Sequence, residues 1–246
     1  MTATERYRAY RRVIAAPDDT EVCWWYSGWT ALQVEGYPDL PVSQIAAIMT
    51  YRAETLSPDR FRIHWSEVGV FRDPVTGELP VSWTNPLSGA QIELPRTFRE
   101  GPGTYTLTCT TDGVAVELEQ PNAQVLDTQV EFHFGAERCW FSQTERKIRG
   151  VPLADGSMSP LASSGLSGVT QLAFFASAAD ALGTSSEFVP ASGTYSFRLA
   201  AIPPSFGFGQ QSGACRTWGT ISKALPGQKL DRTSWERIAQ FFPRDV

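Results

Sequence analysis

From about residue 20 onward, apolar and polar residues alternate along one short segment after another, and no other feature restricts the fold as strongly. Such alternation is typical of β-strands that bury one face. The clearest runs are 61–65, 105–109, 114–118, 126–134, 140–148 and 195–201. Residues 22–29 are almost continuously apolar, as in a strand covered on both faces. Many strands joined by short turns form either a barrel or a sandwich. We predict a mainly β protein whose antiparallel meander closes into a barrel.

Short flanking helices are expected near the two ends of the chain. Residues 4–15 have an amphipathic pattern that places Tyr7 and Tyr10 on the apolar side. Near the other end, Thr233 and Glu236 have the spacing of a capping box, and an apolar stripe follows them. We expect this second helix to plug or flank the sheet, with its stripe in the core.

The chain is expected to form a single domain over residues 1–246. Its 246 residues, 42% hydrophobic and 19% charged, suit one large all-β domain or two small ones, and no internal repeat or convincing boundary divides it. Two stretches, 152–168 and 203–213, interrupt the strand pattern, and we predict them to be mobile loops at the mouth of a cavity. For the first stretch a disordered excursion is an equal alternative, whereas Phe206 and Phe208 favour a lid in the second.

Charge and composition argue against several classes of partner. The net charge is −5 and no cluster of Lys and Arg could follow a phosphate backbone, so no nucleic-acid partner is expected. No apolar run approaches the roughly 18–20 residues of a membrane helix. Residues 1–14 also lack the apolar core of a signal peptide. We expect a cytoplasmic protein with reduced thiols and no membrane partner, and we leave homodimerisation open.

No metal or other cofactor is expected. The four cysteines lack the short Cys or Cys/His spacings of metal sites. With only two histidines a three-histidine site is impossible. A site of two histidines and a carboxylate would need both, which lie far apart in the sequence but could meet in a barrel. The phosphate-binding loop, the dinucleotide-binding glycine motif, the nucleophile elbow and the zinc-protease helix are also missing from the sequence. General acid–base chemistry, which needs no cofactor, remains.

Two segments carry a family resemblance. Residues 24–28 (WWYSG) contain a W-x-Y-x-G pattern, and residues 68–89 contain D-x-x-T-G-E followed by W-x-N-P-x-S-G. Over about residues 20–95, these patterns resemble the bacterial and fungal family catalogued as domain of unknown function 1838. Residues 218–229 look like a degraded form of the C-terminal segment of that family. The resemblance implies a calycin- or lipocalin-like β-barrel, similar in architecture to proteins that bind or convert hydrophobic metabolites. It does not imply a particular activity.

The matched motifs also have a structural interpretation. Residues 73–77 and 85–89 each have the composition of a type I turn followed by a glycine with positive φ. A motif of this kind is more often part of the architecture than of the chemistry. We therefore predict both segments to be turns between strands.

Aromatic residues make up 12% of the chain, with eight tryptophans, and we expect part of them to line a cavity while the rest fill the core. Tyr26, Tyr51 and Tyr105 could donate hydrogen bonds to a substrate oxygen, and Arg146 or Arg216 could hold a carboxylate or an enolate. A purely structural role is the alternative for each. The candidate substrate-binding residues are Trp25, Tyr26, Trp65, Trp83, Asn85, Tyr105, Trp140, Arg146, Phe206 and Phe208.

The candidate catalytic residues are His64, Glu131, His133 and Tyr51. On the strand around residue 130, Asp127, Gln129, Glu131 and His133 share one face, which lines the cavity or, by default for an alternating strand, faces water. His64 alternates with apolar neighbours and is most simply placed outside, yet a histidine can act as acid or base near neutral pH.

Two functions follow, both using an apolar barrel cavity. The first is a cofactor-independent enzyme that converts a hydrophobic oxygenated molecule, aromatic, polycyclic, terpenoid or polyketide-like, by lyase, isomerase or cyclase chemistry. The second is a carrier that binds such a molecule without converting it. An interaction module without a cavity is less favoured, because the aromatic residues recur along strands. An enzyme needs a carboxylate, His or Tyr inside the barrel beside a second polar group, and a carrier does not.

Overall fold

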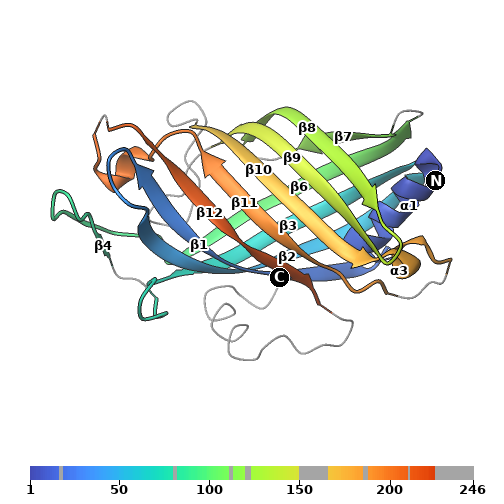
Figure 1. Ribbon diagram of the computed structural model, residues 1–246, viewed down its shortest axis with the longest axis horizontal. Coiled ribbons are helices and arrows are strands. Elements are labelled where there is room, and N and C mark those ends of the chain that lie inside the picture. The colour runs from blue at the N-terminus through green and yellow to red at the C-terminus, as the bar shows by residue number, and fades with distance from the viewer. Residues whose placement is uncertain are drawn as a thin grey trace.

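The computed structural model describes residues 1–16, 19–79, 82–110, 113–119, 123–149, 166–184, 188–209 and 211–224. Most of them belong to one ten-stranded antiparallel sheet that curves into a nearly closed barrel (Figure 1). The strands of this sheet are β1 (Glu21–Val34), β2 (Leu40–Ser57), β3 (Arg60–Arg72), β6 (Thr97–Thr110), β7 (Gly113–Glu119), β8 (Ala123–Phe134), β9 (Arg138–Arg149), β10 (Leu166–Ser177), β11 (Ser192–Leu199) and β12 (Gly213–Lys223). The predicted mainly β barrel is confirmed.

The sheet is a meander in which spatial neighbours follow one another along the chain. The strand order is β7-β6-β3-β2-β1-β12-β11-β10-β9-β8, so the first strand pairs with the last, with Tyr26 opposite Ile221. The free edges are β7 and β8, which are consecutive in sequence but not paired by hydrogen bonds. A small separate hairpin, β4 (Trp83–Thr84) with β5 (Gln91–Ile92), is inserted between β3 and β6. The barrel therefore has one seam, between β7 and β8.

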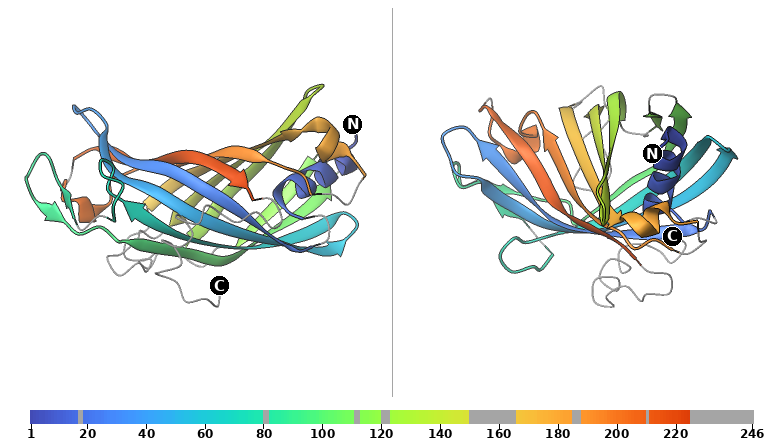
Figure 2. Two further views of the ribbon diagram at one scale, coloured as in Figure 1. Left: turned by 90° about the horizontal axis from the view of Figure 1, so that it is seen from below. Right: turned by 45° about the vertical axis from the view of Figure 1, so that its right-hand side comes forward.

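Two helices occupy one end of the barrel. The views in Figure 2 show α1 (Ala3–Ile14) and α3 (Ala178–Leu182) together there. A capping box between Thr2 and Glu5 starts α1, which buries Tyr7, Tyr10, Val13 and Ile14. The Tyr7 ring packs on Phe61 and the Tyr10 ring on Phe141, both of which point inward from strands. The helix predicted over 4–15 is confirmed, and the one predicted around Thr233 and Glu236 lies outside the described residues.

The opposite end of the barrel carries a second buried cluster. Figure 1 shows β4 at this end. The 3₁₀-helix η1 (Pro204–Phe206) lies next to it: the Trp83 ring of β4 contacts the rings of Phe206 and Phe208 at centroid distances of 5.7 and 6.2 Å. Leu32, Phe197 and Leu199 pack beneath them. Of the first predicted loop, residues 152–165 lie outside the described residues, and 166–168 belong to β10, a correction to its end. The second predicted loop contains η1 and ends where β12 begins.

The two family-like motifs are turns of one kind, as predicted. The Asp73 carboxylate accepts hydrogen bonds from the backbone N–H groups of Val75 and Thr76, and Gly77 follows with a φ of 72°. In the second turn, the Asn85 side-chain oxygen accepts from two backbone N–H groups in the same way, and Gly89 has a φ of 71°. Each glycine occupies the left-handed region that other residues adopt at a cost.

Candidate functional site

The strongest candidate site lies on the inner face of β9. Gln143, Glu145 and Lys147 continue the face of Cys139 and Phe141, which are completely buried. The exposed fraction is 1% for Glu145 and 4% for each of the other two polar residues. Charged residues are almost never buried so fully unless they are paired, so this strand carries an unusual concentration of polar groups into the barrel.

These side chains form a continuous hydrogen-bonded network with α1. The Tyr10 hydroxyl donates to Gln143 Oε1 at 2.7 Å, and Gln143 Nε2 donates to Glu145 Oε1 at 2.6 Å. Lys147 Nζ donates to Glu145 Oε2 at 2.9 Å. Both carboxylate oxygens of Glu145 therefore have a partner, which holds the group in one orientation.

Two tyrosines from the opposite wall complete the network. Tyr105, on β6, lies near the Glu145 side chain, and its ring centroid is 6.4 Å from that of Tyr51 on β2. Burial raises the pKa of Tyr51 and Tyr105 well above the ordinary tyrosine value, and the nearby Glu145 charge raises both further. Both phenols thus stay protonated and act as hydrogen-bond donors. We refer to Tyr10, Tyr51, Tyr105, Gln143, Glu145 and Lys147 as the Glu145 network.

Several buried polar atoms beside this network have no hydrogen-bond partner among the described residues. Thr128 and Thr170 lie directly opposite Glu145 on β8 and β10, and both hydroxyl oxygens are unpartnered. The Tyr26 hydroxyl and the Trp65 ring N–H are unpartnered as well. Unpaired buried polar groups are uncommon and costly, so atoms of this kind are candidates for binding a ligand.

Solvent reaches this part of the interior. Glu67, Val130 and Tyr195 belong to the inner faces of β3, β8 and β11, and all three are only half-buried. The charge of Glu67, which lies opposite Met49 on β2, raises the pKa of both Tyr26 and Tyr51, after the larger effect of their burial. The inner wall here combines aromatic surface with polar groups, as small-molecule sites do.

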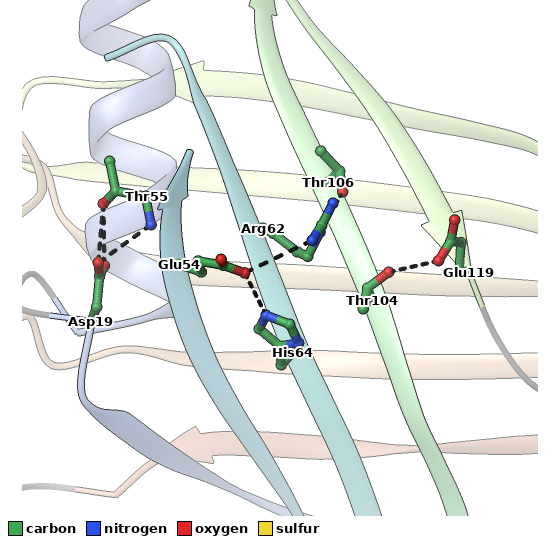
Figure 3. Close-up of polar contacts among 8 residues, drawn as sticks. All are labelled: Asp19, Glu54, Thr55, Arg62, His64, Thr104, Thr106 and Glu119. Atoms are coloured by element: carbon green, nitrogen blue, oxygen red, sulfur yellow. Dashed lines mark hydrogen bonds and ion pairs between the residues drawn. The ribbon is translucent and has the colours of Figure 1, made fainter. Parts of the chain in front are cut away.

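Three of the four predicted catalytic residues lie outside the barrel. His64 Nε2 is 2.8 Å from the Glu54 carboxylate on the outer face of β2 and β3, with Arg62 beside it (Figure 3). Glu131 and His133 face outward from β8, 3.4 Å apart, and the His133 ring stacks on Trp140. The prediction that His64, Glu131 and His133 act inside the barrel cavity is therefore corrected. Their apolar strand neighbours fill the core, so alternation turns them outward.

The predicted substrate-binding residues divide among three places. Tyr26, Trp65 and Tyr105 lie inside the barrel, as does the fourth catalytic candidate, Tyr51. In a correction to their predicted place in a cavity, Trp25, Trp140 and Arg146 face outward. The remaining four, Trp83, Asn85, Phe206 and Phe208, belong to the far end, where Asn85 Nδ2 donates to the Phe206 carbonyl at 3.0 Å.

Sequence reasoning missed Tyr10, Gln143, Glu145 and Lys147. Along β9 both faces carry polar residues from position 142 onward, so alternation alone does not tell which face is buried. The one available signal is that Gln143 and Glu145 share the parity of Cys139 and Phe141. Alternation would also place Leu126 on the face of Val130 and Phe132, but a bulge in β8 after Val125 turns it outward, where it is 49% exposed.

The described residues contain no group of three side chains arranged to hold a metal ion, and none of their helices is long and apolar enough to cross a membrane. All four cysteines are free. No protein-family model matches the sequence, and neither does any curated protein at a significant level. The family resemblance of residues 20–95 therefore stays a prediction.

Proposed function

We propose that the chain is a cofactor-independent enzyme that converts a hydrophobic oxygenated small molecule by acid–base chemistry, of the lyase, isomerase or cyclase type. The observation that carries the proposal is a buried carboxylate, Glu145, held by Lys147 and Gln143 within an aromatic wall. Beside it lie hydroxyls that have no partner in the part of the chain that the structure describes. A site that serves for binding alone has no need of a buried titratable group of this kind.

The roles follow from the chemistry of the groups. Glu145 is the proposed base, which removes a proton from a carbon next to a carbonyl, and Lys147 stabilises its charged form between turnovers. The substrate oxygen, which gains negative charge, is stabilised by neutral donors such as the Tyr26 hydroxyl and the Trp65 ring N–H. Burial strengthens the interactions of Glu145 and Lys147, which are 1% and 4% exposed, because charges interact more strongly where water is excluded.

Proton transfer can be measured without knowing the product. Native mass spectrometry of the purified protein detects a co-purified ligand, and a panel of aromatic and terpenoid ketones supplies further probes. Each molecule that binds is incubated with the protein in D₂O and analysed for deuterium uptake and for changes in mass or retention. We expect uptake with the wild type, a loss of about 10²-fold or more with Glu145→Gln, and no loss with Glu131→Gln, a matched carboxylate on the outer face.

The second candidate, a carrier, is favoured by the aromatic lining and predicts a different outcome. Molecules would bind to the wild type and to Glu145→Gln with equal affinity, and neither protein would exchange deuterium into them or convert them. That result would contradict the proposed enzyme.

A further inference from the structure

A groove crosses the outer face of the barrel over β8 to β12, five strands that lie side by side in Figure 1. Its volume is about 630 Å³, which lies within the range of small-molecule sites. One row of directly opposed residues runs along its floor, one from each strand: Gln129, Thr144, Gln171, Ser196 and Trp218. The floor therefore offers two amides, two hydroxyls and an indole ring on rigid strands.

A row of arginines runs beside this floor. Arg146, Arg198 and Arg216 share the neighbouring register row, in which Arg198 lies directly opposite Arg216. Like charges directly opposite each other destabilise a sheet, and the chain as a whole carries a net charge of −5. Within the described residues, no carboxylate forms an ion pair with any of these arginines. Since no described carboxylate pairs with Arg198 or Arg216, their mutual repulsion favours an anionic partner.

Further contacts define the polarity of the groove. The Arg216 guanidinium lies over the Trp218 ring, 5.3 Å from its centroid, so a cation and an aromatic face are presented together. The carboxylates nearby are Glu131, which lines the groove, and Asp127, opposite Arg146 at one end of the arginine row. The negative side of the groove is thus near β8 and the positive side near β11 and β12.

We propose that this groove binds an anionic carbohydrate, a sugar acid or a sugar phosphate. Amide and hydroxyl side chains match the hydroxyl groups of a sugar, the indole face of Trp218 matches the C–H face of a sugar ring, and the guanidinium groups of Arg198 and Arg216 match a carboxylate or phosphate. A purely apolar ligand does not suit a floor of glutamine, threonine and serine. A nucleic acid does not suit a short row of three arginines on an acidic protein.

The groove and the Glu145 network lie on opposite faces of the sheet. Thr144, on the groove floor, and Glu145, in the Glu145 network, are consecutive residues of β9 and point to opposite faces of the sheet. Changes in the groove can therefore be made without touching the interior site.

Isothermal titration calorimetry and protein NMR with glucuronate, glucose 6-phosphate, glucose and inorganic phosphate test the proposal. We expect glucuronate or glucose 6-phosphate to bind at least tenfold more tightly than glucose and phosphate. Arg216→Gln and Trp218→Ala should each weaken that binding at least fivefold, whereas Arg52→Gln, an exposed arginine on β2, should leave it unchanged.

Three results would overturn the proposal: no binding of either charged sugar, equal binding of phosphate and glucose 6-phosphate, or equal binding by Arg216→Gln and wild type. Because Trp218 is half-buried, its variant is checked for a wild-type circular dichroism spectrum, and Gln171→Ala, an exposed floor residue, serves as a second groove variant. Chemical shift changes confined to β8–β12 would support the assigned place, and changes confined to other strands would contradict it.

Discussion

The ammonium group of Lys147 lies 2.9 Å from the carboxylate of Glu145, and both side chains are almost completely removed from solvent inside the barrel. Burying two charges has a large desolvation cost, which mutual attraction and further hydrogen bonds offset only when the geometry is good. Here Gln143 Nε2 supplies an additional hydrogen bond to Glu145 Oε1, at 2.6 Å. The pair is thus a sensitive probe of how the interior is organised.

Replacing Lys147 by Met is expected to lower the free energy of unfolding by about 3–5 kcal/mol, because it leaves the Glu145 carboxylate buried without its cation. Adding Glu145→Gln to that variant should recover part of the loss, since no buried charge is left. Urea unfolding of the wild type and both variants measures these values. A loss under about 1 kcal/mol in the single variant would mean that the pair behaves as an exposed one.

Tyr10→Phe is expected to lower the free energy of unfolding by about 1–3 kcal/mol, because it removes the donor to Gln143 and leaves a buried acceptor unsatisfied. The matched control is Tyr37→Phe, whose ring is 46% exposed and whose loss should have almost no effect. Equal denaturation midpoints for the two variants would contradict the link between α1 and β9.

Lys223 should make stability depend on pH above neutrality. Its Nζ donates to the backbone carbonyls of Arg12, Val13 and Ala15 at the end of α1, and burial, with repulsion from Arg12, lowers its pKa to about 7. In the unfolded chain the pKa is about 10.4. Between these values the unfolded chain binds more protons than the folded one, so the free energy of unfolding rises with pH.

The measurement is the difference in unfolding free energy between wild type and Lys223→Met from about pH 6 to pH 10. The unfolding free energy of the wild type minus that of the variant should increase as pH rises above about 7, with a slope approaching 1.4 kcal/mol per pH unit. Loss of the hydrogen bonds to the three carbonyls shifts this difference by a constant amount and does not change its slope. A difference that stays flat, or that falls with pH, would contradict the lowered pKa.

His64→Ala is expected to leave both the denaturation midpoint and any deuterium exchange by the protein close to wild type. The hydrogen bond from His64 is the largest cause of the lowered pKa of Glu54, yet both side chains are well exposed, and exposed pairs contribute little. His133→Ala, on the same outer surface, should behave alike. Loss of exchange in either variant would move the proposed chemistry to the outside of the barrel.

Arg198→Gln is expected to raise the free energy of unfolding by about 0.2–1 kcal/mol, because it removes a like-charge pair across β11 and β12. Arg52→Gln is the control, since Arg52 lies opposite Glu21 and its removal relieves no repulsion. Thermal unfolding at low and high salt measures both. The gain should shrink at high salt, and a gain that is independent of salt would contradict its electrostatic origin.

Local features of this protein were predictable because they depend on residues close together in sequence. The turns at 73–77 and 85–89 follow from one Asx side chain and one glycine each, and α1 follows from a capping box and an amphipathic pattern. Trp65 and Tyr105 were recognisable as inner-face candidates because they alternate in step with apolar neighbours such as Ile63 and Leu107.

The Glu145 network was not predictable in the same way, because strand alternation sorts residues into two sets without telling which set is inside. For β8 the apolar set decided the question, apart from the bulge that exposes Leu126. For β9 both sets are polar from position 142 onward, and the packing of Phe141 against Tyr10 of α1 decided that Glu145 faces inward.

The sequence by itself determined the mainly β meander, the N-terminal helix and the turns, since hydrophobic period and turn chemistry act over a few residues. Only the tertiary structure decided which polar groups are buried and which strands meet. Closing the sheet pairs β1 with β12 and brings Tyr10, Tyr51 and Tyr105 to Glu145 from three other elements. Such contacts join residues far apart in the chain, and their energies depend on a shared low-dielectric interior that no local pattern encodes.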